Sequence, residues 1–271
     1  MISVKWEELF KSDFEERIAQ QAIVYLPLGL CEPHGHIAVL GLDTIKANYL
    51  CETAALRWGG IVAPVQGYQI HETGYHAAWL NRVVGNANTY MTSMPPAPIL
   101  YHFLYQLRTF HNAGFKLSFI ITGHAGGNQD DLRLAAKLFS KKTDMEIEVF
   151  SDPELTDGKY TGDHAGKYEI SQLMYLRPEL VDMDKITHWE FDKPETRFAQ
   201  GEDAANATLD YGRQIINDCL DGIHNIINKH QSNARQERKI MTFETVEEVW
   251  QELKRFPWIT LQPEYKKPNT Y

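Results

Sequence analysis

Short apolar runs alternate along this chain with longer segments of helical periodicity, and this alternation restricts the fold more than any other feature. The apolar runs have the length of buried strands and lie at 23–28, 61–65, 117–122 and 146–151. The segments with helical spacing of apolar residues lie at 43–58, 98–113, 129–141 and 204–229. Strands that alternate with helices predict an α/β protein with three αβα layers and a mostly parallel central sheet.

The length and composition predict one globular domain with an extension. The 271 residues are enough to bury a large core, and a hydrophobic content of 43% with 23% charged residues is ordinary for a globular protein. After residue 229 the long helical pattern stops, and a short amphipathic helix over 244–254 precedes Pro- and Lys-rich coil. We therefore expect a domain over 1–230 and a C-terminal extension over 231–271.

Charge and hydropathy exclude several classes of partner. The net charge of −9, with no long basic tract, argues against binding to nucleic acid or to an anionic membrane. No apolar run approaches the length of a membrane span, and the N-terminus lacks the layout of a signal peptide, so we expect a cytoplasmic protein. The three cysteines are odd in number and widely spaced, which fits reduced thiols better than a disulfide framework.

Acidic and imidazole side chains gather just after the first predicted strand. Glu32 and His34 are two residues apart, so an extended backbone sends both side chains to the same face, and Asp43 follows a short loop later. Carboxylates and an imidazole at the end of a strand in an α/β fold are typical of a divalent metal site. Because a Glu two residues before a His arises about once by chance in a chain with 11 His, the pair needs partners elsewhere.

A glycine-rich turn follows the third predicted strand. Residues 122–128 read Thr-Gly-His-Ala-Gly-Gly-Asn, and glycines between a strand and a helix would suit a phosphate cradle. The turn lacks the Lys of a P-loop and the glycine spacing of a dinucleotide site. The favoured interpretation is therefore that His124 is a metal ligand at the same edge of the sheet as Glu32 and His34.

A third cluster lies at 163–171, which reads Asp-His-Ala-Gly-Lys-Tyr-Glu-Ile-Ser. It places His164 and Glu169 on either side of the start of a predicted helix. The simpler interpretation is that Asp163 caps this helix and that Glu169 is exposed. The functional interpretation gains weight because this is the third acid and imidazole cluster predicted where a helix follows a strand.

Together the three clusters resemble the creatininase (creatinine amidohydrolase) family. The resemblance covers residues 20–230 and rests on Glu32-x-His34, Asp43 eleven residues after the Glu, the Gly-His-x-Gly-Gly-Asn-like turn and the Asp-His-Ala-Gly-x-x-Glu-x-Ser run. It implies a layered α/β fold, two divalent metal ions per subunit and a homo-oligomer, often a hexamer. Family members open cyclic amides, deformylate ring-opened pyrimidines, cleave a peptide precursor or hydrolyse other ring compounds, and for this chain we expect a small-molecule substrate.

The resemblance also implies metal ligands in this chain. They are Glu32, His34, Asp43, His124 and Glu169. Asp43 would bridge the two ions, joining Glu32 and His124 on one side and His34 and Glu169 on the other. Such mixed oxygen and nitrogen donors accept Zn²⁺, Mn²⁺ or Fe²⁺.

Three further residues receive roles from the resemblance. His164 would be the acid/base residue, because an imidazole can donate and accept a proton near neutral pH. Asp163 beside it is expected to contact substrate. His76 is expected to do the same, because the loop over 66–79, which also carries His71, borders the pocket in this resemblance.

The chain departs from the family pattern around this predicted site. Relatives usually carry a second His five residues after the Glu, where this chain has Ile37. The turn after His124 has one extra residue, and some relatives take a ligand from that turn, where this chain has only Gly126 and Gly127. The metal set is therefore expected to be complete while the surrounding pocket differs.

The function expected from the sequence is hydrolysis with a water molecule bridging two metal ions, acting on a small cyclic amide or a related ring carbonyl. One alternative is a carbon–carbon hydrolase of a cyclic diketone or keto-inositol (the 3-dehydro-scyllo-inosose hydrolase type) on the same metal site. The other is a metal-binding scaffold without catalytic activity. The choice of substrate is expected to depend on the loops around the metal site.

Overall fold

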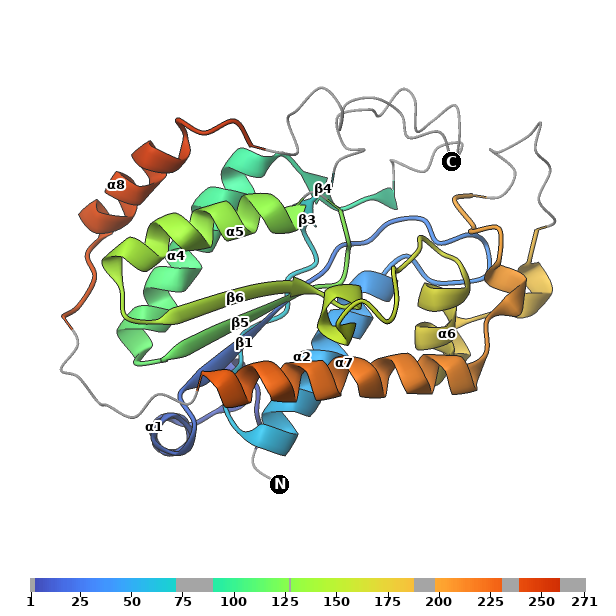
Figure 1. Cartoon of the computed structure of the whole chain (residues 1–271), viewed down its shortest axis with the longest axis horizontal. Coiled ribbons are helices and arrows are strands. Elements are labelled where there is room, and N and C mark those ends of the chain that lie inside the picture. Colours follow the sequence, from blue (N-terminus) through green and yellow to red (C-terminus); the bar gives the residue numbers. More distant parts are fainter. Residues whose placement is uncertain (1–2, 72–89, 127, 188–197, 231–238, 259–271) are drawn as a thin grey trace.

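Four parallel strands form the central sheet in the part of the chain that the structure describes (Figure 1). The computed structural model describes residues 3–71, 90–126, 128–187, 198–230 and 239–258. The strands are β1 (Ile23–Leu28), β2 (Ile61–Val62), β5 (Leu117–Thr122) and β6 (Glu146–Ser151), in the order β2-β1-β5-β6. Every residue of β1 and β5 is buried, as expected for parallel strands covered on both faces. The predicted parallel sheet is confirmed.

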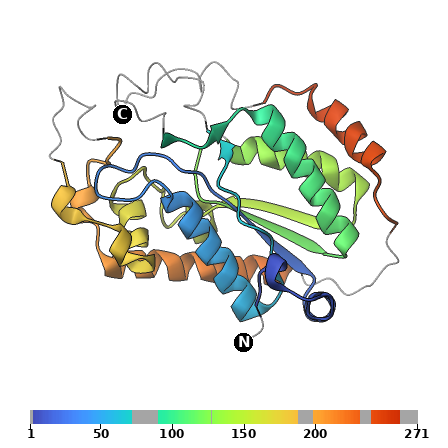
Figure 2. The same cartoon turned by 180° about the vertical axis from the view of Figure 1, so that it is seen from behind.

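Helices cover both faces of this sheet (Figures 1 and 2). On one face lie α4 (Pro96–Ala113), α5 (Asn128–Phe139) and, outside them, α8 (Phe243–Leu253). On the other face lie α2 (Leu42–Trp58) and α7 (Leu209–Lys229). Alternate side chains of β1 join the two cores: Leu26 packs in the first and Tyr25 in the second. The predicted three-layer αβα fold is confirmed.

Two more α-helices and a small ribbon flank these layers. α1 (Lys11–Gln20) lies beside the β2 edge, and α6 (Lys167–Leu176) packs against α7. A second, two-stranded parallel sheet joins β3 (Gln69–Ile70) to β4 (Ser93–Met94). None of the helices in the described part of the chain is both long and apolar enough to cross a membrane.

The structure shifts some of the predicted boundaries. The strand expected over 61–65 ends at Val62. The helix expected from residue 204 begins at Leu209, because Thr208 caps it by accepting a hydrogen bond from the N–H of Tyr211. α4 begins at Pro96. Proline suits the first turn of a helix, because N–H groups in that turn make no hydrogen bond within the helix and the N–H that proline lacks is not needed there.

The two central strands send the chain to opposite faces of the sheet. β1 leads into α2 on one face, whereas β5 leads into α5 on the other (Figure 1). In open α/β sheets the crevice at the carboxyl ends of two such neighbouring strands is the usual place for a ligand. The fold therefore directs attention to the loops that follow Leu28 and Thr122.

Gly212 allows α7 to pack closely against α6. A Cβ atom on this residue would overlap the backbone carbonyl of Ser171 in α6. We expect Gly212→Ala to lower the free energy of unfolding by about 1–3 kcal/mol, because overpacking must push the two helices apart. Urea denaturation measures this change.

Gly67→Ala is the matched control for this substitution. Its new Cβ would meet only the Thr44 hydroxyl at 3.9 Å, an ordinary contact, so stability should change little. If Gly212→Ala unfolds at the same urea concentration as the unaltered protein, the close approach of α6 and α7 is not required.

Candidate metal centre

The five ligands implied by the sequence meet at the carboxyl edge of β1 and β5. They come from separate elements: the loop after β1, the first turn of α2, the turn after β5 and the first turn of α6. The residues, in chain order, are Glu32, His34, Asp43, His124 and Glu169, and all are buried. Charged side chains are seldom buried without partners, so this concentration of buried acids and imidazoles marks a site.

Asp43 reaches the middle of the cluster because α2 begins against the end of β5. A Cβ atom on Gly123, the residue that follows β5, would overlap the backbone carbonyl of Asp43. Only glycine permits this approach. The glycine-rich turn therefore serves to bring a carboxylate from α2 next to His124.

One group of donors consists of His34, Asp43 and Glu169. The Nδ1–H of His34 donates a hydrogen bond of 2.9 Å to the backbone carbonyl of Glu32, which directs Nε2 inward as the atom that could bind a metal ion. This Nε2 lies 3.6 Å from Asp43 Oδ1 and 3.5 Å from Glu169 Oε2. Neither His34 Nε2 nor either carboxylate oxygen of Asp43 has a hydrogen-bond partner. Buried polar atoms without partners are costly, so this geometry suits a cation between them.

A second group of donors surrounds Glu32. Its Oε1 lies 2.9 Å from His124 Nδ1, and its Oε2 lies 2.8 Å from His71 Nε2. The rings of the two histidines stack with their centroids 4.4 Å apart. One carboxylate and two imidazoles within reach of one another can hold a transition-metal ion.

The sequence did not single out His71 as a ligand. This residue follows the two-residue strand β3, and the pairing of β3 with β4 carries it to the site. Thr92, just before β4, joins this ribbon to Cys31, whose N–H donates to the Thr92 hydroxyl at 2.7 Å. The only signal in the sequence was the position of His71 in a loop expected to border the pocket.

Asp43 lies between the two groups. Its Oδ1 faces His34, and its Oδ2 is 3.9 Å from His124 Nδ1. The arrangement therefore offers two neighbouring positions for cations with one carboxylate between them.

The charges of these groups depend on each other. Burial would raise the pKa of Glu32, but the surrounding imidazoles of His124, His164 and His71 outweigh it and hold that pKa well below its ordinary value. Burial, with the nearby carboxylates, raises the pKa of Asp43.

The pKa values in the other group shift for similar reasons. Burial opposes the charged form of His34, yet Asp43 and Glu169 together raise its pKa to about 9. A bound metal ion would replace this proton as the positive charge.

His164 lies at the mouth of the site. Its ring stacks on that of His34 with centroids 5.0 Å apart, and its side chain is 29% exposed, so solvent and substrate can reach it. The Nε2–H donates a hydrogen bond of 3.0 Å to the carbonyl of Pro33. In the neutral ring this leaves Nδ1 as the basic atom, 3.9 Å from Glu32 Oε1.

The turn after His164 is strained. Ala165 has φ of 50°, a left-handed conformation that an L-residue with a side chain adopts at a cost of about 1–3 kcal/mol. Its N–H donates a hydrogen bond of 2.9 Å to Glu169 Oε2. The strained residue thus connects His164, its neighbour in the chain, to the Glu169 carboxylate in the group of His34, Asp43 and Glu169.

The residues expected to contact substrate have a less direct relation to the cluster. The Asp163 carboxylate accepts hydrogen bonds from the N–H groups of Gly166, Tyr168 and Glu169 at the start of α6. This is the capping interaction that the sequence also allowed, and a contact of Asp163 with substrate stays a prediction. His76 lies outside the described residues.

Lys46 is a second residue that the sequence reasoning missed. It lies in α2 one turn after Asp43, its side chain is 2% exposed, and its Nζ pairs with Glu169 at 2.6 Å and Asp152 at 3.2 Å. A lysine in a predicted helix is normally solvated, so the sequence carried no signal for this one.

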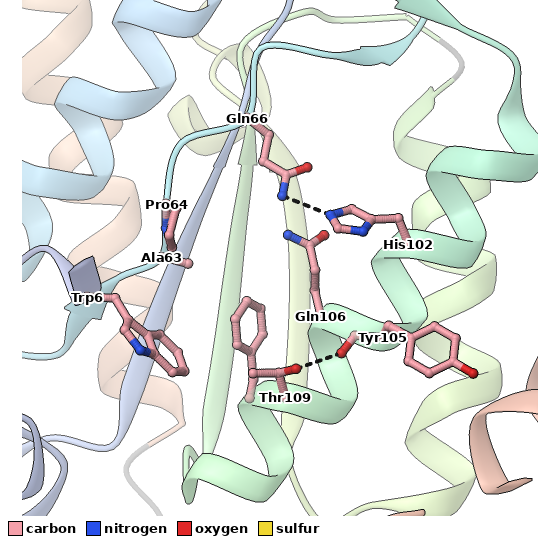
Figure 3. Close-up of a pocket in the computed structure, with 9 residues that line it drawn as sticks. Trp6, Ala63, Pro64, Gln66, His102, Tyr105, Gln106 and Thr109 are labelled. Atoms are coloured by element: carbon pink, nitrogen blue, oxygen red, sulfur yellow. Dashed lines mark hydrogen bonds between the residues drawn. The ribbon is translucent and has the colours of Figure 1, made fainter. Parts of the chain in front are cut away.

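A separate cavity of about 390 Å³ lies between α4 and the segment after β2 (Figure 3). Trp6 and Phe110 contribute to its apolar lining, and Gln66 bonds to His102 at 3.2 Å across it. No residue of the buried acid and imidazole cluster lines this cavity, so the two sites are distinct.

Sequence comparisons identify relatives of the chain. The sequence model of the creatininase family, described as creatinine amidohydrolase, matches residues 7–227. A creatinine amidohydrolase from Pseudomonas putida is 24% identical over 257 residues, which cover 81% of this chain and 94% of the relative. The matched region of the family contains the whole cluster described above.

Solved creatininase structures share the fold. A crystal structure of creatinine amidohydrolase (creatininase) has a TM-score of 0.72 at 20% identity and covers 86% of this chain and 100% of that chain. A creatininase structure designated Mn has a TM-score of 0.70 at 22% identity, with coverage of 84% and 98%. A creatininase variant complexed with creatine has a TM-score of 0.66 at 23% identity, with coverage of 85% and 100%.

Asp43→Asn tests whether this carboxylate is built to face cations. The amide keeps the shape of the side chain. It removes a buried negative charge that two neighbouring acids repel. We expect the purified variant to lose roughly half of its metal or more, measured by mass spectrometry of the elements, because a neutral amide is a poor ligand. In EDTA the variant should be at least as stable as the unaltered protein, and added metal should no longer raise its melting temperature.

Glu52→Gln is the control on the same helix. Glu52 pairs with Lys5 at 2.9 Å at the surface, so its loss should change neither metal content nor the effect of EDTA. Full metal content in Asp43→Asn would contradict the role assigned to this carboxylate.

Proposed function

Because the chain belongs to the creatininase (creatinine amidohydrolase) family, it is a metal-dependent hydrolase, and we propose that it opens a small cyclic amide or a related ring carbonyl with activated water. One observation carries this proposal. The two carboxylate oxygens of Asp43 have no hydrogen-bond partner and lie between two groups of nitrogen and oxygen donors. Amides are poor electrophiles, so their hydrolysis requires both a strong nucleophile and a polarised carbonyl.

The same proposal assigns the ligands of two divalent ions, Zn²⁺, Mn²⁺ or Fe²⁺. The ligands of the first are Glu32, His71 and His124, and those of the second are His34, Asp43 and Glu169. Asp43 would be shared, because its Oδ2 also faces His124. When bound, the ions would supply a nucleophile by lowering the pKa of water and would polarise the substrate carbonyl.

His164 is proposed to move the proton in this reaction. The bond from its Nε2–H to Pro33 fixes the ring so that Nδ1 faces the site, 3.9 Å from Glu32. Nδ1 can accept the proton that water releases and deliver it to the leaving nitrogen, which is general acid/base catalysis. The partial exposure of the ring lets the substrate approach this atom.

The wider setting belongs to the same proposal. We expect a small-molecule substrate, no nucleic-acid or membrane partner, a homo-oligomer such as a hexamer, and a cytoplasmic location. The net charge of −9 supports the absence of a nucleic-acid partner. The packing of α8 against α4 and α5 supports an extension that is attached to the domain of residues 1–230.

His164→Ala tests the role of the imidazole. We expect turnover to fall by at least about a hundredfold while the metal content stays the same, because general acid/base catalysis contributes about 10²–10⁴-fold. His102→Ala is the control, since His102 lines the separate cavity and should be replaceable without loss. Equal turnover in His164→Ala and the unaltered enzyme would remove His164 from the mechanism.

A substrate panel tests the reaction class. The protein loaded with Mn²⁺ or Zn²⁺ should hydrolyse at least one compound among creatinine, hydantoins and dihydropyrimidines, followed by NMR, and EDTA should abolish the activity. Turnover of a cyclic diketone or keto-inositol alone would replace amide hydrolysis by carbon–carbon hydrolysis. Bound metal without turnover of any compound would favour a metal-binding scaffold.

A further inference from the structure

Lys46 is a buried cation that the proposed hydrolysis does not use. Its Nζ lies 2.6 Å from Glu169 Oε1, 3.2 Å from Asp152 Oδ1 and 3.8 Å from Asp43 Oδ1. Three carboxylates thus surround the ammonium group, and a charge buried in a protein interior is stable only with such partners.

The ammonium shares two carboxylates with a proposed metal position. Glu169 divides its oxygens, with Oε1 toward Lys46 and Oε2 toward His34 at 3.5 Å. Asp43 Oδ1 is 3.6 Å from His34 Nε2 and 3.8 Å from Lys46 Nζ. A divalent ion held by His34, Asp43 and Glu169 would thus bind to carboxylates that a lysine already neutralises in part.

Asp152 holds the ammonium from the opposite side. Its Oδ2 accepts hydrogen bonds from the Tyr168 hydroxyl at 2.9 Å and from Gln172 Nε2 at 3.1 Å, both in α6. Its Oδ1 has no hydrogen-bond partner apart from the ion pair with Lys46. Asp152 is fully buried and belongs to neither group of metal donors. Its negative charge therefore balances the ammonium of Lys46.

From this geometry we infer that Lys46, anchored by Asp152, is a fixed counter-ion of the His34–Asp43–Glu169 position. It keeps the acidic side chains assembled before metal binds and lowers the affinity of that position for a divalent ion. The inference rests on the proposed function only in that these three residues bind metal. Lys46 is a positioning residue and not a ligand, because an ammonium has no lone pair.

Two single substitutions should act in opposite directions. Lys46→Met removes the positive charge, so we expect the affected metal position to bind Mn²⁺ at least about tenfold more tightly, since like charges at this separation repel strongly in a protein interior. Asp152→Asn removes the carboxylate that offsets part of the lysine's charge. Only the metal ligands then balance Lys46, so metal binding there should weaken at least about tenfold. Calorimetric titration of the EDTA-treated full chain with Mn²⁺ measures both.

Thermal unfolding provides an independent readout. EDTA-treated Lys46→Met buries Glu169 and Asp152 without their cation, so its melting temperature should fall. Mn²⁺ should restore this stability, because the metal then replaces the missing charge and binds only the folded state. Lys46→Arg keeps the charge and should bind Mn²⁺ more like the unaltered protein than like Lys46→Met.

The outcomes separate the inference from the proposed function. Unchanged or weaker Mn²⁺ binding by Lys46→Met, or unchanged or tighter binding by Asp152→Asn, would overturn the counter-ion role. If Lys46→Met fails to fold in EDTA, Asp152→Asn still decides, since it retains the lysine. If His34→Ala leaves the number of bound Mn²⁺ ions unchanged, the metal assignment fails instead.

Discussion

Buried negative charge is the constraint on which the rest of the structure depends. Glu32, Asp43, Asp152 and Glu169 are all buried at one edge of the sheet. Carboxylates in a protein interior are stable only when cations or hydrogen-bond donors compensate them. Here imidazoles surround Glu32 and an ammonium lies between Glu169 and Asp152, yet the oxygens of Asp43 have no hydrogen-bond partner. The incomplete compensation at Asp43 supports the proposed role of the cluster as a receptor for cations rather than a closed ion-pair network.

The fold was predictable because its central elements have strong local signals. β1, β5 and β6 occupy the ranges expected from their apolar runs, and α2 and α4 end where the helical patterns over 43–58 and 98–113 end. β3 and β4 were not predicted, because two-residue strands carry no periodicity and form only through their pairing. The start of α7 was placed five residues early, because the short turn at Ala204–Asn206 continues the helical pattern up to the capping Thr208.

The candidate site was predictable in part. Its five implied ligands follow strands or begin helices, where the order of elements in an α/β fold brings them to one edge. His71 and Lys46 could not be found in this way. His71 depends on the docking of the β3 ribbon, and Lys46 depends on the packing of α2 between carboxylates from two other segments. Both are tertiary contacts between residues distant in the chain, for which neither spacing nor composition is a guide.

Ile37 shows how the metal centre and the pocket around it can vary separately. At this position the family pattern has a second His, but here the side chain is buried against Leu42 and Ile170 in the core between α2 and α6. A histidine there would place an imidazole in an apolar cluster, at a cost of desolvation. The imidazoles that face Glu32 come instead from the segments after β3 and β5 and from the turn before α6. The chain thus retains a charged centre suited to hydrolysis while part of its surroundings differs from the family pattern. Residues in those surroundings, rather than the proposed ligands, must decide which substrate this hydrolase accepts.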